Sequence, residues 1–423
     1  MDERRAHAAV EAVWRIESGR LVAGLARLVR DVGLAEELAQ DALVRALEVW
    51  PRAGVPENPG AWLMATGKHA ALDRLRRDRT LERKEEQLVN EAGARFALSA
   101  AEVAVAREED LGDDLLTLVL TCCHPVLSPA ARTALTLRAV AGLTTEEIAR
   151  AFLLPVPTVA QRIVRARRTL KEEGVGFTAP APDELAERLD SALEIVYLVF
   201  NEGYTATTGE DWMRPALCSD ALRLGRVLAS LLPQEPEVHG LVALMELQAA
   251  RIGARTDTHG APVLLDDQDR ARWDRLLLGR GLAALKRAEA LGGALGLYAL
   301  QAAIAACHAR APSAAATDWP QIALLYSALA ERTGSPVVEL NRAVAVGRAE
   351  GPAPGLAIVE RLLGEDALPG YHLLPAVHGD LLERLGRDEY ARAAFTRAAS
   401  LATNAREREL LAARAAGADR RVP

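Results

Sequence analysis

The side chains of this chain best suited to binding chemistry are cations gathered in one short segment. Between Thr158 and Lys171 there are five basic residues and no carboxylate. Guanidinium groups bind phosphate oxygens, and polar side chains beside them can hydrogen-bond to base edges. The segment therefore predicts a contact with the major groove of DNA. The residues predicted to make it are Thr158, Gln161, Arg162, Arg165, Arg167 and Arg168.

Two helices have to position these side chains. Thr144 and Glu147 have capping-box spacing, so a helix is expected to begin there and to end before Pro155. Pro157 fits the first turn of a second helix. One side of that second helix is apolar, through Val159, Ile163, Ala166 and Leu170. The pattern predicts a helix-turn-helix. The alternative is a surface helix with a solvated charged face, which is what most charge runs are.

Composition limits what the rest of the molecule can be. The 423 residues are 50% hydrophobic and 26% charged, which indicates a folded chain of two to four domains. The net charge of -7 excludes a protein that coats nucleic acid through its whole surface, so DNA contact must come from local patches. The first residues contain no apolar signal core, and the four cysteines have no zinc spacing. We expect a cytoplasmic protein without a membrane span.

A second basic segment lies near the N-terminus. A helix is expected from Asn58-Pro59, with Trp62 near its start and a basic end. An aromatic ring beside a cationic track suits single-stranded DNA, by stacking and phosphate contact, although a lone tryptophan is more often part of a core. The residues of this candidate site are Asn58, Trp62, Lys68, Arg74, Arg76 and Arg77.

The helix expected over residues 34–50 is strongly amphipathic and acidic. Glu37, Asp41 and Arg45 share one stripe at four-residue spacing, with Glu36 and Gln40 beside it. Taken by itself, the pattern is that of an exposed amphipathic helix whose ion pairs contribute only a few tenths of a kcal/mol each.

The C-terminal part is expected to form stacked helical hairpins. Ala391, Phe395 and Ala398 match the packing positions of a tetratricopeptide repeat, and Ala357 lies one 34-residue period before Ala391. Gly355 lies in a comparable turn region. The alternative is a helical domain without true repeats.

The expected fold class is all-α, with three domains and two linkers. The first domain covers residues 1–79, and a polar linker follows at 80–110. The boundaries of the other parts are 111–175 for the helix-turn-helix domain, 176–182 for a second linker and 183–423 for the helical extension.

The order of these parts resembles a bacterial sigma factor of the extracytoplasmic-function class, which keeps regions 2 and 4. The resemblance rests on the acidic helix, the Pro/Gly loop at 51–60, the segment WLxxxxxxxxLDxLRR, and the motifs TxxEIA and PxPTVxxRxxRAR. Residues from Asp183 onward, with VYLVFNEGY among them, resemble the tetratricopeptide-like extension of one subgroup. The implied fold is two small helical domains followed by a helical-hairpin domain.

The resemblance also implies partners and roles. Core RNA polymerase is the implied partner, through its β′ clamp helices and β flap, together with promoter DNA and a regulatory protein on the extension. The residues implied to contact the clamp helices are Glu36, Glu37, Gln40, Asp41 and Arg45. The basic segment from Asn58 matches the −10 contact, and the helix from Thr158 matches the −35 contact.

Three residues depart from the pattern of the class. His69 stands where asparagine is usual, Leu153 where the turn commonly has glycine, and Ala160 where a cation is frequent. The rival classes of protein are a helix-turn-helix regulator that does not join polymerase and a repeat scaffold.

No enzyme activity, cofactor or metal site is expected. No nucleophile is spaced with a base, and the carboxylates at 266–269 are expected to cap a helix instead of binding a metal ion. Asn201 to Tyr204 fits a ligand-binding corner and, equally well, a helix-ending turn at Gly203.

Overall fold

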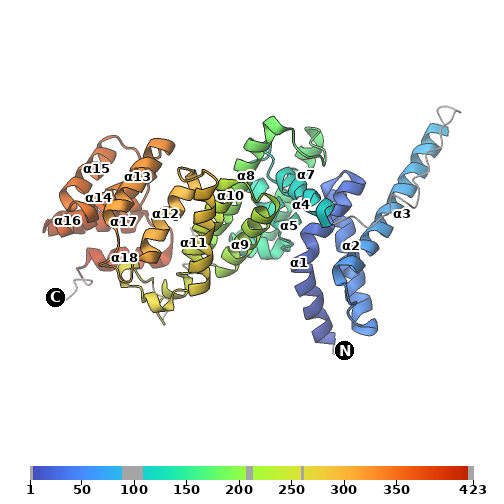
Figure 1. The fold of residues 1–423 in the computed structure, drawn as a ribbon, viewed down its shortest axis with the longest axis horizontal. Helices are drawn as coiled ribbons and strands as arrows, with labels where there is room; N and C mark the ends of the chain where they lie inside the picture. Colours follow the sequence, from blue (N-terminus) through green and yellow to red (C-terminus); the bar gives the residue numbers. More distant parts are fainter. Residues whose placement is uncertain (1–2, 88–107, 206–212, 259–261, 418–423) are drawn as a thin grey trace. The chain divides into compact units, whose positions relative to one another are not determined.

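The computed structural model describes residues 3–87, 108–205, 213–258 and 262–417. Within these ranges all regular structure is helical, and the only extended pairing is an antiparallel bridge between Thr256 and Pro262. The predicted all-α class is confirmed. The chain divides into two compact units, Met1–Ile195 and Val196–Pro423, and the division falls within helix α8 (Pro182–Tyr204) (Figure 1).

The first unit holds all the candidate nucleic-acid-binding residues. Its core is built around α1 (Glu3–Val29), whose Leu21 and Leu25 are fully buried, as are Trp50 of α2 (Val32–Ala53) and Leu63 of α3 (Pro59–Gln87). The side chain of Asp31 caps α2 by accepting a hydrogen bond from the Leu34 amide at 3.0 Å. The helices before α8 are α1 (Glu3–Val29), α2 (Val32–Ala53), α3 (Pro59–Gln87), α4 (Glu108–Cys122), α5 (Pro129–Ala139), α6 (Thr145–Ala151) and α7 (Val156–Glu172).

Helix α3 extends further than its apolar pattern predicts. The sequence loses its apolar period near residue 80, yet the helix continues to Gln87. The added turns consist mostly of Glu, Arg, Lys, Leu and Gln, which have high helix propensity. Part of the expected 80–110 linker is therefore helical.

The second unit is a succession of helices that pack mainly on their neighbours along the chain, and α10 also packs on α12. Besides the end of α8 its α-helices are α9 (Pro215–Leu231), α10 (Pro236–Ala249), α11 (Arg275–Ala290), α12 (Leu297–Arg310), α13 (Trp319–Thr333), α14 (Pro336–Ala349), α15 (Pro352–Gly364), α16 (Leu373–Arg384), α17 (Asp388–Leu401) and α18 (Ala405–Ala415). Three short 3-10 helices connect α10 to α11.

The predicted packing residues of the extension are partly right. Ala391, Phe395 and Ala398 of α17 are buried, as expected. Ala357 is exposed, so the 34-residue register through it is wrong. Gly355, the fourth residue of α15 as Ala391 is of α17, is buried there instead. A β-carbon on Gly355 would lie 2.9 Å from the α-carbon of Gly347, so the missing side chain lets α14 and α15 cross closely.

Glycine also has a different role at the end of α8. Helix α8 ends at Tyr204, so the predicted helix end is confirmed, but Gly203 itself is still helical and is not a left-handed cap. A β-carbon there would lie 2.7 Å from the Cys218 amide nitrogen on α9. The residue is needed for close helix packing.

The acidic segment at 266–269 does serve as a cap. Asp269 accepts a hydrogen bond from the Ala271 amide at 2.9 Å, and Asp266 pairs with Arg348. None of the described helices is both long and apolar enough to cross a membrane.

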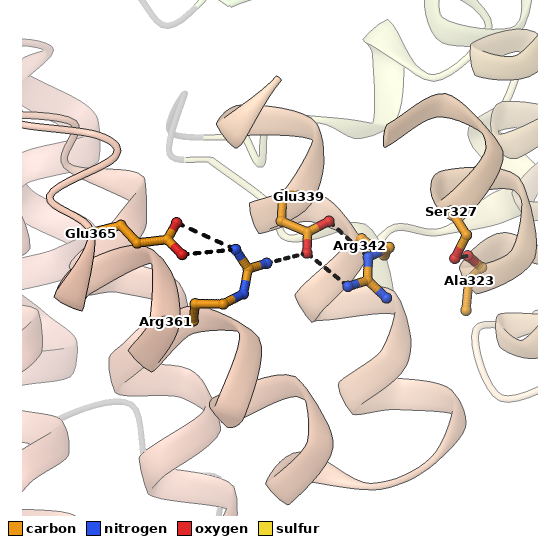
Figure 2. A network of polar contacts seen from close by, with 6 residues as sticks. All are labelled: Ala323, Ser327, Glu339, Arg342, Arg361 and Glu365. Atoms are coloured by element: carbon orange, nitrogen blue, oxygen red, sulfur yellow. Dashed lines mark hydrogen bonds and ion pairs between the residues drawn. The ribbon is translucent and has the colours of Figure 1, made fainter. Parts of the chain in front are cut away.

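A charged network joins α14 to α15 (Figure 2). Glu339 accepts hydrogen bonds from Arg342 at 2.7 and 2.8 Å and from Arg361 at 2.5 Å. Arg361 also reaches Glu365 at 3.3 Å. The hydrogen bonds from Arg342 hold the pKa of Glu339 below its usual value. The carboxylate form of Glu339 therefore stabilises the folded state.

The Glu339→Gln substitution is expected to lower the free energy of unfolding by about 1 kcal/mol at neutral pH. Because the folded-state pKa of Glu339 is depressed, its contribution is present above the unfolded-state pKa, about 4.3, and is lost as the pH falls through the folded-state value. Urea unfolding at pH 7 and pH 3 measures this. The exposed Glu365→Gln is the matched control, and an equal effect of the two variants at pH 7 contradicts the prediction.

Candidate nucleic-acid interface

The predicted helix-turn-helix is present as α6 and α7. Thr144 accepts a hydrogen bond from the Glu147 amide at 3.1 Å, and the Glu147 carboxylate accepts one from the Thr144 amide at 2.8 Å. Both halves of the capping box are thus formed. The helix start predicted from this spacing is confirmed.

The turn between the two helices contains a strained residue. Leu153 has φ of +50°, in the left-handed region that favours glycine. This explains physically why a glycine would suit the position. Pro155 then precedes α7 as its N-cap, and Pro157 lies in the first turn, where no backbone donor is needed.

Leu153→Gly is expected to stabilise the first unit by about 1 kcal/mol, because it removes the left-handed strain. The side chain is half-exposed, so little burial is lost. Thermal unfolding measures the effect. The neighbouring Leu154→Gly is the control and is expected to destabilise, since Leu154 has no positive φ to relieve. A Leu153→Gly variant that unfolds earlier than the wild type contradicts this explanation.

Helix α7 separates its apolar and basic faces. Val159, Ile163, Ala166 and Leu170 are buried, and they hold the helix against the rest of its domain. The polar face consists of exposed Gln161, Arg165 and Arg168 with half-buried Thr158 and Arg162. Arg168 also lies 3.4 Å from Glu172, and both side chains are largely exposed. The face that the sequence predicts for DNA is open to solvent.

Arg167 lies away from this face. Its guanidinium pairs with the carboxylate of Glu36 on α2, which also accepts a hydrogen bond from Arg138 at 2.6 Å. Glu36 is only 4% exposed. In this structure two cations of the helix-turn-helix domain therefore enclose a residue that was expected to face polymerase.

Further contacts join the N-terminal helices to the helix-turn-helix domain. The Trp14 indole donates to the Gly142 carbonyl at 3.1 Å, and Arg15 pairs with Glu147 at 2.7 Å. A β-carbon on Gly19 would lie 2.7 Å from the Val140 carbonyl oxygen, so α1 approaches that backbone closely. The sequence patterns did not predict these contacts. Gly19 and Gly142 are sequence features consistent with such a close approach, and Gly142 has φ of +74° in the structure.

The other candidate polymerase contacts on α2 are accessible. Glu37, Asp41 and Arg45 are exposed, and Arg45 pairs with Glu48 at 2.9 Å. Gln40 is half-buried and donates to Glu36 at 3.1 Å. The same helix presents the exposed apolar residues Val44 and Leu47, which were not among the predicted contacts. The sequence feature that could have indicated them is a pair of apolar residues three positions apart on an otherwise charged helix.

The start of α3 carries the first part of the second candidate site. Asn58 is exposed, and its side-chain oxygen accepts a hydrogen bond from the Ala61 amide at 3.0 Å, so it caps the helix. Trp62 is half-buried with its ring edge-on to Trp50, 5.5 Å between centroids. The Trp62 ring is therefore fixed in place while part of it stays accessible.

The basic end of α3 lies on the surface. Lys68 is half-buried, and Arg74, Arg76 and Arg77 are exposed. Asp73 is close to two of them, 3.6 Å from Arg76 in an ion pair and, through its carbonyl, 3.2 Å from Arg77. The three exposed arginines therefore lie within about one turn of α3, and Lys68 lies apart from them.

The thiols do not form a second kind of site. Cys122 and Cys123 are fully buried, and Cys123 lies 3.2 Å from the Thr136 hydroxyl. Burial raises the pKa of the Cys123 thiol to about 11, so it stays protonated at neutral pH. In the part of the chain that the structure describes, no group of three His, Cys, Asp or Glu residues is arranged to hold a metal ion.

Three segments of the chain match known protein families. Residues 16–80 match sigma-70 region 2, and residues 117–170 match sigma-70 region 4. Residues 188–289 match a family of unknown function, DUF6596.

Individual proteins are similar over different lengths. An uncharacterized protein of Rhizobium meliloti (strain 1021) is 45% identical over 90% of this chain and 89% of its own length. The probable ECF RNA polymerase sigma factor SigI of Mycobacterium tuberculosis is 26% identical over 45% of this chain and 68% of its own. The probable RNA polymerase sigma-C factor of Mycobacterium bovis is 30% identical over 33% of this chain and 70% of its own.

A capped helix-turn-helix with an exposed basic face, together with a second helical domain that carries a group of exposed arginines, defines a DNA-binding protein of the two-domain sigma type. With both region matches and the sigma-C similarity, the chain belongs to the sigma-70 family of RNA polymerase sigma factors. It carries an additional helical C-terminal region.

Proposed function

We propose that this sigma factor is of the extracytoplasmic-function class and directs core polymerase to promoters through three surfaces of its first unit. Helix α2 docks on the β′ clamp helices, α3 holds the melted strand of the −10 element, and α7 reads the −35 duplex. The helix-turn-helix domain also contacts the β flap. The protein acts by binding, in the cytoplasm.

The observation that carries this proposal is the exposed basic face of α7. Gln161, Arg165 and Arg168 are accessible while the opposite side of the helix is buried, which suits insertion into a major groove. The protein as a whole is acidic, at -7, so this local excess of cations is specific to the face.

Helix α3 supports the second contact. Its exposed arginines suit the phosphates of a single strand, and the partly accessible ring of Trp62 suits a base. Two modest contacts on one promoter combine through effective concentration when a linker allows both.

The burial of Glu36 refines the polymerase contact. The residues on α2 that are accessible for docking are Glu37, Asp41 and Arg45, with Val44 between them. Glu36 can reach polymerase only after its ion pairs with Arg138 and Arg167 break.

The C-terminal unit regulates the first through protein contacts. Its stacked helical pairs, with small residues at the α14–α15 crossing, are typical of domains that bind other proteins. This role stays a prediction, as does the tetratricopeptide classification.

Run-off transcription tests the proposal. The full-length protein is added to core polymerase with a library of promoter-sized DNA fragments, and the transcribed templates are sequenced. We expect transcripts from templates that share two elements, one near −10 and one near −35. Protein that selects DNA fragments but yields no transcript with core polymerase would contradict it.

A further inference from the structure

Val164 is an apolar side chain on the solvent side of α7, beside its basic face. It is 63% exposed, whereas the residues that pack the helix into its domain are buried. The domain core therefore does not account for a valine at this position. Gln161 and Arg168 lie about one helical turn before and after it on the same side of the helix, whereas Arg165, the next residue, points about 100° away.

The major groove of DNA offers one apolar group to such a side chain, the C5 methyl of thymine. Arginines at the edge of a recognition helix contact phosphates, which fix its position without reading sequence. The residues facing the groove floor then determine which bases are accepted. Val164 has no polar atom and can read only a methyl group.

The spacing along α7 suits this role. In recognition helices that lie in the major groove, residues at spacings of three, four and seven positions contact successive bases. Pro157, Ala160, Gln161 and Val164 have this spacing. Gln161 and Val164 are separated by about 4.5 Å along the helix axis, against about 3.4 Å between base pairs. Glutamine pairs with adenine edges, so the two residues suit an adenine and a thymine one or two base pairs apart.

We propose that Val164 is a specificity-determining residue of the −35 contact and packs on the C5 methyl group of a thymine. The inference rests on the proposed function, because it requires α7 to lie in the groove of the −35 element. It adds a readout that the cations of α7 cannot supply.

Deoxyuridine tests this contact at the level of one methyl group. The −35 element is first selected with full-length protein and core polymerase, and each of its thymines is then replaced singly by deoxyuridine, which keeps every hydrogen-bonding group. We expect one replacement to weaken binding of the wild-type holoenzyme about fourfold, the factor for burial of one methyl-sized group. In Val164→Ala the thymine and deoxyuridine duplexes should differ much less.

Arg165→Ala is the control variant. It should weaken binding to thymine and deoxyuridine duplexes alike and retain the difference between them. The inference is overturned if the deoxyuridine effect is unchanged in Val164→Ala, if no replacement weakens wild-type binding, or if the selected element has no thymine. If the wild-type holoenzyme selects no −35 element at all, the proposed function itself fails, which is a different result.

Discussion

Reversing the charge of Arg165 and Arg168 to glutamate is expected to weaken binding to promoter DNA roughly 100-fold or more. Each substitution removes a charged hydrogen bond to phosphate, and together they account for about 3 kcal/mol. The slope of log affinity against log salt should also become shallower by about two, one for each phosphate that is no longer neutralised. Fluorescence anisotropy with labelled promoter DNA over a range of salt concentrations measures both.

The matched control reverses two exposed arginines of the C-terminal unit, Arg392 and Arg397 on α17. It changes the net charge equally, so it corrects for general repulsion between an acidic protein and DNA. Equal reductions of affinity in the two double variants would contradict a specific role of α7.

Glu36 and Glu37 are expected to have opposite roles although they are neighbours on α2. Removing the Glu36 carboxylate leaves Arg138 and Arg167 without their shared partner, so Glu36→Ala should destabilise the first unit by about 3 kcal/mol. Glu37 is exposed, so Glu37→Ala should leave stability within about 0.5 kcal/mol. Urea unfolding followed by tryptophan fluorescence measures this difference.

For the affinity to core polymerase we expect the larger loss from Glu37→Ala, the opposite of the order expected for stability. Glu37→Ala is expected to weaken it by about 1 kcal/mol, roughly fivefold, as for one exposed ionic contact. Hydrogen exchange should rise in α2 and α7 of Glu36→Ala and stay unchanged in Glu37→Ala. A Glu36→Ala variant as stable as the wild type would show that the ion pairs seen here contribute nothing to the fold.

The features predicted correctly from the sequence are those fixed by neighbouring residues. The capping box of Thr144 and Glu147 involves atoms three residues apart, and the two faces of α7 follow from its own spacing. A proline in the first turn and an apolar stripe are equally local. The region 2 and region 4 matches agree with the order of motifs that the sequence displays.

The features that were missed depend on contacts between distant segments. From the sequence, Glu36 is expected on the surface. In the structure it is buried against Arg138 of α5 and Arg167 of α7. Gly203 resembles a helix-ending glycine because the sequence does not show that Cys218 packs against it. Ala357 lies one 34-residue period before Ala391, but the buried residue of α15 that corresponds to Ala391 is Gly355, two positions earlier.

Footprinting of the complete holoenzyme on a selected promoter detects the −35 contact and the melted −10 element in one experiment. We expect protection of the −35 duplex together with permanganate-reactive, unpaired thymines at −10. The change of Arg165 and Arg168 to glutamate should remove both signals. Protection of duplex DNA without any unpaired thymines would contradict the proposed function, because the protein would then bind DNA without opening a promoter.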